Sequence, residues 1–600
     1  MNTPQSLHTY DFIIVLAYFA IVIWVGVYFK KFVKQAKDYF AAGSGVPWWL
    51  AGISQWMGSH SATMFVIYSQ IAFKYGFVAM TICWAVVPAM ILAATFFAHR
   101  WRRTRVMTPL GFMEQRYSKT IQQVFVWTGL PIRVLDNALR ILATTIFIAA
   151  VVNQGWLSLQ LGILILGLLM LTYSMLGGQM AVLITDFFQA VVLSIAVVML
   201  LPLSLKVVGG FSGLVAAAKT TPGVPDTFFK LIAPPYDLFY WIMFSLVILL
   251  NYNASWGLVQ KYNCVATEKD SRKVAVTMGV LSFISPPIFF IPAMVARVYL
   301  PKIMGSGVLA RSDEVYALIA LKVLPVGVMG LLVAAMFSAT LSTIGNEFNV
   351  LSGILTKDFY QKIIRPGADD KRLVFVGRIN TAIIGGLVTV LAVGLMYVKK
   401  VFNLIDIMVK VFGALGPAIM LPLLGGLILK KINSKGAVTG VIAGTISGVS
   451  LVVLNAVFLG VYGGQLAQNA ALSYWLKQGW NSAAIGVNIL VTLLGMVLGS
   501  RFSKTPPDEQ ARAHEFLERM KIPTEPLIKT GEERESPFHI VGIALILFGS
   551  IMLAVTALVL FTIPSRSAFV INLIAASVML ASGLLLNWRT RKSKAAAAAR

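Results

Sequence analysis

The chain has 600 residues, of which 58% are hydrophobic and only 12% are charged, and its mean hydropathy is +0.80. A soluble domain carries about 25% charged residues, so this composition excludes an ordinary soluble protein and indicates a polytopic membrane protein. The net charge of +26 would suit a nucleic-acid-binding protein. However, the basic residues cluster in short connections between apolar segments, as the positive-inside rule describes. We therefore expect the lipid bilayer as a partner, and no nucleic acid.

The apolar segments predict an all-α fold with about fifteen transmembrane helices, because a helix needs about 20 apolar residues to cross the hydrocarbon core. In chain order, the predicted spans are 10–29, 47–73, 77–98, 121–152, 157–174, 179–206, 236–260, 273–298, 327–355, 373–398, 402–429, 436–459, 481–500, 538–561 and 567–587. The start of the chain has no basic region followed by a cleavage site, so we expect the first span to remain in the mature protein.

The basic connections predict the orientation of the chain in the membrane. They place the N-terminus outside, the C-terminus in the cytoplasm, and the protein in the cell inner (plasma) membrane as a multi-pass protein. Segment 501–537 is polar and is predicted to be cytoplasmic, with one short surface helix to which we assign no chemistry. The connections that fix these sides are 30–37, 99–105, 268–273, 357–365, 430–435 and the tail 587–594.

Two of the predicted spans are interrupted by polar and small residues. The second span contains GISQWMGSHSATMF (52–65), and the seventh contains LLNYNASWGLVQ (249–260). Non-helical backbone at membrane depth is tolerated where it lines a cavity or is buried in protein. Two interrupted spans at corresponding places in the two halves of a chain indicate a transporter binding site. Each is the first member of a set of five spans, and an odd number gives the two sets opposite orientations.

The ninth span carries the motif SATLST, in which Ala339, Ser342 and Thr343 share one helix face. The carbonyl of Ala339 and the hydroxyls of Ser342 and Thr343 can therefore converge on one point. Uncharged oxygens in a dry place suit a small hard cation. The alternative is that both hydroxyls bond back to carbonyls of their own helix, which is common for Ser and Thr in membrane helices.

Six motifs follow one another along the chain, namely DYFAAGSGVPWWLAGIS (38–54), TPLGFMEQRYS (108–118), TYSMLGGQMAVLITDFFQ (172–189), WGLVQ (256–260), ATLST (339–343) and KDFY (357–360). Their order and spacing make the chain resemble the sodium:solute symporter family, which includes sodium–glucose and sialic-acid symporters. This resemblance implies a leucine-transporter-type five-plus-five inverted repeat, with one leading and about four trailing helices. We expect a leading helix and linker in 1–46, the ten-helix transport core in 47–429 and the trailing helices in 430–600.

The resemblance also implies a sodium site between the second and ninth spans. Its ligands would be the backbone carbonyls of Met57, His60 and Ala339 and the hydroxyls of Ser342 and Thr343. The bulky side chains of Met57 and His60 do not argue against this site, because a carbonyl ligand does not depend on its side chain. His60 is also a possible proton carrier, since imidazole titrates near neutrality. Its alternative role is a hydrogen-bonding wall of the cavity.

An acidic residue, Asp186, lies inside the sixth span, where charges are costly and usually functional. In some relatives this acid lies on the exit path or helps to hold a second sodium ion, together with hydroxyls one turn below the first site. Here those positions are Gly345 and Asn346. Asn346 offers an amide oxygen but Gly345 offers no side chain, so the second sodium is open. The alternative is an Asp186 that is hydrated near the inner mouth.

The substrate site is expected to involve two cations within the membrane. Arg140 offers a planar fork suited to a carboxylate, or else pairs with Asp136 four residues earlier. Lys410 either faces the cavity, pairs with Asp406 or snorkels to the surface. Two cations facing one cavity would favour an anionic substrate. The residues predicted to surround the substrate are Ser59, Ser61, Cys83, Arg140, Tyr252, Ser255, Trp256, Gln260 and Lys410.

We therefore predict a sodium-coupled secondary symporter that imports a small organic solute by alternating access. The positions that sugar symporters use for glucose or galactose are largely changed here, for example to Cys83 and Ser255, which favours a sugar acid or other carboxylate. A neutral sugar is the alternative, and a sensor or receptor that reuses the transporter fold is the alternative from another class. The sequence shows no zinc spacing, Ser-His-acid arrangement or phosphate-binding loop, so we predict no enzyme. We infer no obligate protein partner.

Overall fold

The computed structural model has no β-strand among the residues that it describes, which are 7–30, 45–106, 108–152, 158–398, 404–465, 469–524, 538–562 and 565–598. In this part of the chain, eleven helices are long and apolar enough to cross a membrane, and the bent pair α12 and α13 brings the number to twelve. The basic connection 30–37 and residues 525–537 of the polar segment lie, wholly or almost wholly, outside the described residues.

Every predicted span falls on a helix or on a broken helix. The helices that carry the spans are α1 (Thr9–Lys30), α3 (Trp48–Met57) with α4 (Ser69–Tyr75), α5 (Val78–Trp84) with α6 (Val86–Leu92) and α7 (Ala98–Arg103), α9 (Lys119–Val152), α10 (Leu159–Lys206), α12 (Leu238–Ala254) with α13 (Trp256–Cys264), α14 (Glu268–Met304), α16 (Val328–Gly353), α17 (Asp370–Val398), α18 (Leu404–Ile428), α19 (Ser434–Tyr462), α21 (Trp480–Arg501), α23 (Phe538–Thr562) and α24 (Arg566–Ala598). The shorter elements between them include η2 (Met64–Tyr68), η3 (Ala93–Phe97), α8 (Gly111–Arg116), α11 (Gly210–Thr220), α15 (Val315–Val323), η5 (Ile354–Ile364), α20 (Ala470–Tyr474) and α22 (Pro507–Arg519).

Two predicted spans, 157–174 and 179–206, lie within the single helical segment α10. The hydroxyls of Tyr173 and Thr185 are hydrogen-bonded to each other across the junction. Twelve residues of straight helix would separate their backbones by about 18 Å, which is too far for these side chains to meet. The chain therefore bends sharply between them, so α10 contains two apolar arms. The first arm, Leu159–Met175, is too short to count among the eleven long helices.

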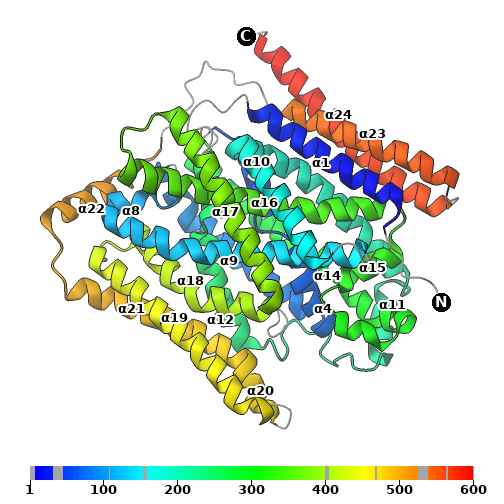
Figure 1. The fold of residues 1–600 in the computed structure, drawn as a ribbon, viewed down its shortest axis with the longest axis horizontal. Helices are drawn as coiled ribbons and strands as arrows, with labels where there is room; N and C mark the ends of the chain where they lie inside the picture. Colours follow the sequence, from blue (N-terminus) through cyan, green and yellow to red (C-terminus); the bar gives the residue numbers. More distant parts are fainter. Residues whose placement is uncertain are drawn as a thin grey trace.

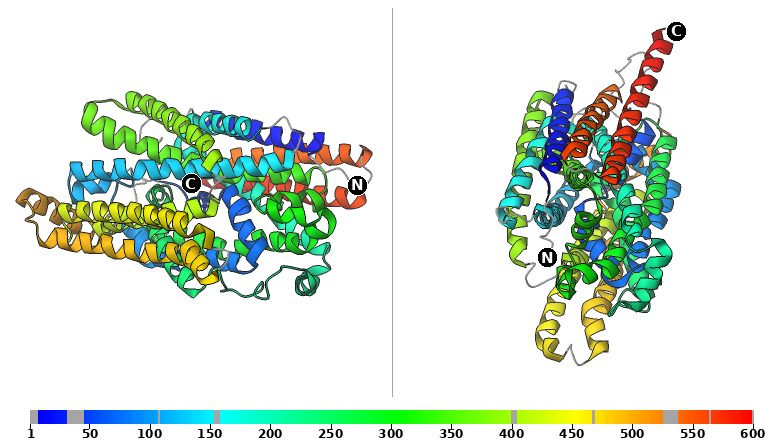
Figure 2. Two further views of the ribbon diagram at one scale, coloured as in Figure 1. Left: turned by 60° about the horizontal axis from the view of Figure 1, so that its bottom comes forward. Right: turned by 90° about the vertical axis from the view of Figure 1, so that its right-hand side faces the viewer.

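The helices form an elongated bundle with α16 at its centre (Figure 1). Every residue of α16 is buried, so this helix reaches neither lipid nor water. Helices α1, α23 and α24 lie on one flank, and α19 and α21 lie on the opposite flank (Figure 2). At one end of the bundle lie α8 and α22, and α11 lies at the other end (Figure 1). A polar segment within α16 must therefore face other helices.

The leading and trailing helices both hold the start of α16. The Asp11 carboxylate of α1 accepts hydrogen bonds from the backbone N–H groups of Gly327, at 2.7 Å, and Gly330, at 2.8 Å. These N–H groups have no partner within their own helix, and a carboxylate is a suitable cap for them. On α24, the Asn572 side chain donates to the carbonyl of Val326 at 2.8 Å. The flanking helices thus fix the position of the central one.

Both predicted interruptions are present. Helix α3 ends at Met57, and helical structure resumes after Ser61. Helices α12 and α13 meet at Ser255 with a bend of 44°. The backbone N–H of Val46, just before α3, donates to the carbonyl of Cys264, the last residue of α13, at 3.0 Å. The beginning of the first broken span is therefore joined to the end of the second, as opposite orientations require.

The predicted surface helix of the polar segment is α22, and it packs on α8. The rings of Phe516 and Phe112 stack with 5.8 Å between their centroids. Beside them, Arg103 of α7 forms an ion pair of 2.8 Å with Glu268, the first residue of α14. Arg103 also donates to the carbonyl of Met520 at 3.0 Å, and Glu268 accepts from the backbone N–H of Thr524 at 2.8 Å. The described part of the polar segment therefore lies against the ends of α7, α8 and α14.

Candidate functional site

The predicted ion site lies where α16 crosses the break after α3. The hydroxyl of Thr343 is 3.0 Å from the carbonyl oxygen of Ala339 and 3.4 Å from that of Met57. It also donates to the carbonyl oxygen of His60 at closer range. Met57 is the last residue of α3, and His60 lies inside the break. The structure thus brings together four of the five predicted oxygen ligands.

The fifth predicted ligand, Ser342, is fully buried next to this cluster. Its hydroxyl lies beside the carboxylate of Asp186, and it makes no hydrogen bond of normal geometry in the described part of the chain. Oxygens from carbonyls and hydroxyls are the ligands that hard cations prefer. The residues present therefore fit a small monovalent cation.

A second hydroxyl of α16 holds the chain on the far side of the break. Thr340 accepts a hydrogen bond from the backbone N–H of Ala62 at 3.1 Å. It also shares a hydrogen bond of 2.7 Å with Thr144 of α9. The backbone just after the break is therefore held by α16, and α16 is in turn bonded to α9.

The imidazole of His60 points away from the ion site into a wall of aromatic residues. Its Nδ1 lies 2.7 Å from the carbonyl oxygen of Trp56 and 3.0 Å from the hydroxyl of Ser59. The ring contacts the rings of Trp56 and Phe289. His60 lines a separate small pocket with Tyr252 and Phe289 and does not line the larger cavity beside the ion site, so both roles stay predictions.

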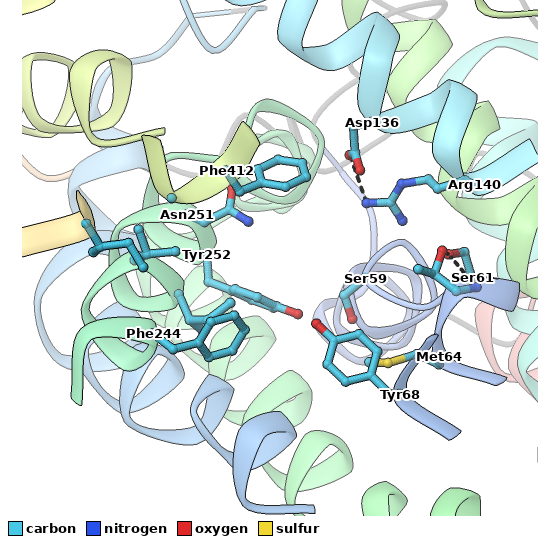
Figure 3. Close-up of a pocket in the computed structure, with 15 residues that line it drawn as sticks. Ser59, Ser61, Met64, Tyr68, Asp136, Arg140, Phe244, Asn251, Tyr252 and Phe412 are labelled. Atoms are coloured by element: carbon cyan, nitrogen blue, oxygen red, sulfur yellow. Dashed lines mark hydrogen bonds and ion pairs between the residues drawn. The ribbon is translucent and has the colours of Figure 1, made fainter. Parts of the chain in front are cut away.

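A cavity of about 110 Å³ lies beside the ion site (Figure 3). Four of the predicted substrate residues line it, namely Ser59, Ser61, Arg140 and Tyr252. The hydroxyl ends of Tyr252 and Tyr68 point toward one another across it (Figure 3). The other lining residues are Thr63, Met64, Tyr68, Asp136, Phe244, Val247, Ile248, Asn251, Phe412, Gly413 and Ile485.

Arg140 lines the cavity and is also paired. Its Nη2 lies 2.9 Å from the Asp136 carboxylate, one helical turn earlier on α9. Among the described residues, Nη2 is the sole nitrogen of Arg140 with a hydrogen-bond partner in the structure. Figure 3 shows one guanidinium nitrogen on Asp136 and the others turned away from it. Both interpretations of this arginine are therefore compatible with the geometry.

The remaining predicted substrate residues lie outside the lining of this cavity. Cys83 lines a separate small pocket that also contains Tyr252 and Ser282. Ser255 accepts a hydrogen bond from Arg133, and Trp256 lines another pocket with Arg133. Gln260 is buried in α13. Lys410 lines a small pocket with Asn455 and Trp480, so it does not join Arg140 at the cavity. The side chain of Asp406, its predicted partner, lies outside the described residues.

Asp186 is completely buried, which overturns the interpretation that it is hydrated near the inner mouth. Its Oδ2 accepts hydrogen bonds from Ser54 and from Asn346, the latter at 3.1 Å. The ammonium of Lys261 lies 3.9 Å from the same oxygen and donates to the amide oxygen of Asn346. Sequence reasoning missed Lys261, although a lysine directly after Gln260 inside a broken span was a visible signal.

Position 345, one of the two positions where some relatives carry a hydroxyl, has no space for a side chain in this protein. A Cβ at this position would lie 2.9 Å from Cε1 of Tyr173. This tyrosine is buried and its hydroxyl is bonded to Thr185. Any side chain at position 345 would therefore displace a fixed aromatic ring.

Comparison with known proteins shows the family of this chain. The sodium:solute symporter family matches residues 39–444. The sodium/glucose cotransporter of Vibrio parahaemolyticus is 26% identical over 468 residues, covering 74% of this chain and 85% of the relative. The sodium/sialic acid symporter SiaT of Proteus mirabilis (strain HI4320) is 24% identical over 461 residues, covering 74% of this chain and 90% of the relative.

The fold also matches a solved structure of a Na⁺-coupled sialic acid symporter in a substrate-bound, outward-open state. The TM-score is 0.69 at 20% identity, and the match covers 83% of this chain and 98% of that chain. The predicted leucine-transporter-type fold is thereby confirmed. The family match and the transporter relatives make this chain a multi-pass membrane transporter and not an enzyme. The chain belongs to the sodium:solute symporter family.

Proposed function

We propose that this protein is a sodium-coupled symporter that imports a small organic solute by alternating access, with sodium held between α3 and α16. The observation that carries the proposal is the position of the Thr343 hydroxyl against the carbonyls of Met57 and His60. The names of the relatives, which are sodium/glucose and sodium/sialic acid transporters, support sodium as the coupling ion.

The break after α3 can link the ion to the solute. Met57 and His60 supply carbonyls to the ion site, and Ser59 and Ser61 between and after them line the cavity. A cation bound to these carbonyls would fix the backbone of the break and hence the two serines. A ligand that prefers one arrangement of a protein shifts the population towards it. Sodium would therefore organise the solute site before the solute binds.

The favoured solute is a small carboxylate, such as a sugar acid. Arg140 reaches the cavity and retains donors beyond those used by Asp136. A guanidinium pairs well with a carboxylate in a planar, two-bond geometry. Since Lys410 lies elsewhere, this proposal now depends on Arg140 alone.

A neutral sugar or polyol is the second candidate, and the uncharged polar lining favours it. The hydroxyl and amide groups around the cavity come from Ser59, Ser61, Tyr68, Asn251 and Tyr252. Such groups hydrogen-bond sugar hydroxyls. In addition, the Asp136–Arg140 pair is neutral as a whole.

The proposed setting is the plasma membrane, with the N-terminus outside and the C-terminus in the cytoplasm. The transport core would comprise residues 47–429, flanked by the leading segment 1–46 and the trailing segment 430–600. The basic connections described above support this orientation.

Uptake by purified protein in liposomes tests the proposal. Candidate solutes are first selected by thermal-shift screening of sugar acids, neutral sugars and amino acids, with sodium chloride or choline chloride. We expect one class to stabilise the protein more in sodium, and its uptake to require an inward sodium gradient. Accumulation that is unchanged in choline would reject sodium coupling. Sodium-dependent binding without any accumulation would instead support the sensor alternative.

A further inference from the structure

The buried cluster around Asp186 already contains a positive charge. Lys261 is 1% exposed and Asp186 is fully buried, and their charged atoms are 3.9 Å apart. Asn346 bridges them, because its amide nitrogen donates to Asp186 and its amide oxygen accepts from Lys261. An isolated charge in such a place is costly unless it is paired. The two side chains therefore neutralise each other inside the bundle.

This cluster lies directly beside the proposed sodium site. The amide nitrogen of Asn346 donates to the backbone carbonyl of Ser342 at 2.8 Å, and Ser342 precedes Thr343. Ser54, which bonds to Asp186, lies one turn before Met57 in α3. Four helices, α3, α10, α13 and α16, thus meet at the cluster.

Without Lys261, the cluster would resemble a second cation site. Asp186 has one carboxylate oxygen without a partner among the described residues. The hydroxyls of Ser54 and Ser342 lie beside the Asp186 carboxylate. The amide oxygen of Asn346 lies on the Lys261 side of the cluster. Carboxylate, hydroxyl and amide oxygens are the usual ligands of hard cations.

Lys261 engages two of these ligands, the amide oxygen of Asn346 and the carboxylate of Asp186. Its ammonium occupies the amide oxygen of Asn346 and faces the carboxylate. An ammonium is a compact charge with three donors and no acceptor, so it satisfies oxygen ligands much as a monovalent metal ion does. Gly345 supplies no replacement oxygen, because Tyr173 fills the space beside it.

We infer that Lys261 acts as a tethered cation that occupies the position of a second sodium ion, so that this protein binds a single sodium per protomer. The inference rests on the proposed sodium coupling. Because the lysine is part of α13, it cannot diffuse away as a free ion can, and it compensates the charge of Asp186 in this structure. Lys261 is a positioning residue in this account, since it touches neither the cavity nor the Thr343 site.

Equilibrium binding of radioactive sodium to the purified protein tests the inference. We expect one sodium ion per wild-type protomer and one more in Lys261→Met, which frees the oxygens around Asp186. The matched control is the double variant Asp186→Asn/Lys261→Met, which removes both charges and should return to the wild-type number. Lys261→Arg keeps the charge and should also bind no additional sodium.

The outcomes separate the inference from the proposed function. Two sodium ions in the wild type, or no additional ion in a folded Lys261→Met protein, would overturn the inference. No sodium in the wild type but one in Lys261→Met would support the role of Lys261 and reject sodium coupling. If Lys261→Met does not fold, the number of sodium ions bound by the wild-type protein decides, and one bound ion supports the inference. In a folded Lys261→Met protein, the midpoint of thermal unfolding should also rise with sodium chloride more than in the double variant.

Discussion

Arg133 and Glu347 form a buried ion pair between α9 and α16, with 3.7 Å between Nη1 and Oε1. The same Arg133 nitrogen donates to the hydroxyl of Ser255 at 3.1 Å, in the break between α12 and α13. A Cβ on Gly257 would lie 2.6 Å from Oε1 of Glu347, so the carboxylate lies against the start of α13. Helix α16 therefore holds the second break through Glu347, as it holds the first through Thr343.

Glu347→Gln should destabilise the protein. It removes one charge of a buried pair and leaves Arg133 uncompensated, which in other proteins costs about 3–5 kcal/mol. We expect a lower midpoint of thermal unfolding in detergent. The double variant Arg133→Met/Glu347→Leu should recover much of the loss, because no buried charge remains. Glu518→Gln on α22 is the control for an exposed ion pair with Lys521 and should change little. An unchanged midpoint in Glu347→Gln would contradict this role.

Thr343→Ala and Ser342→Ala should each weaken sodium binding. Loss of one oxygen ligand to a charged group is worth about 1.5–3 kcal/mol, which corresponds to a decrease in affinity of about 10- to 100-fold. The measurement is the sodium concentration at half-maximal binding or thermal stabilisation. Ser352→Ala is a matched control on the same helix, because its buried hydroxyl bonds to the carbonyl of Gly377 at 2.6 Å and lies away from the site. Wild-type affinity in both variants would remove the proposed site.

Arg140→Gln should separate the two candidate solute classes. If the solute is a carboxylate, loss of a charge-assisted pair should weaken its binding by about 10-fold or more. A neutral sugar should be affected far less. The double variant Asp136→Asn/Arg140→Gln controls for the carboxylate that the single change leaves unpaired. Unaltered binding of a carboxylate solute in a stable double variant would show that Arg140 does not recognise it.

If one sodium ion is carried per transport cycle, the charge of the solute decides whether transport generates an electrical current. A neutral solute carried with one sodium moves one charge, and the voltage term is worth about 2.3 kcal/mol per 100 mV. A monoanion carried with one sodium moves no net charge, so a tenfold sodium gradient supports only about tenfold accumulation. Electrical recording from proteoliposomes should therefore show a sodium-dependent current for a sugar and none for a sugar acid. A positive inward current with a monoanion would require another co-transported cation.

Much of the fold could be predicted from the sequence. Long apolar runs indicated the helices, and polar residues within two of them indicated the breaks. The cluster at Thr343 was also accessible, because Ala339 and Thr343 share a helix face and resemblance supplied the partner segment. The Asp136–Arg140 pair followed from a spacing of one turn. These predictions depend on local patterns, which a sequence displays directly.

The buried ion pairs could not be predicted in the same way. Lys261 and Asp186 lie on different helices, as do Arg133 and Glu347, and their pairing depends on how four helices pack. The cavity lining posed the same difficulty. Lys410 was a candidate for the cavity because it resembles a sugar-binding position of relatives, with pairing to Asp406 or snorkelling as the alternatives. Which of these applies depends on the rotation of the helix about its axis. A resemblance at low identity does not fix that rotation.

The backbone contact between Val46 and Cys264 has a mechanical consequence. Together with the hydrogen bond of 3.0 Å from the Gln55 side chain to the carbonyl of Leu258, it joins α3 and α13 into one unit. If the proposed alternating access moves α3 and α13 together relative to α16, the carbonyl of Met57 would move away from the hydroxyl of Thr343. Under the proposed mechanism, this separation would open the ion site. A disulfide between cysteines introduced at Val46 and Val265 should leave transport intact, and inhibition reversed by reductant would show that the two halves separate.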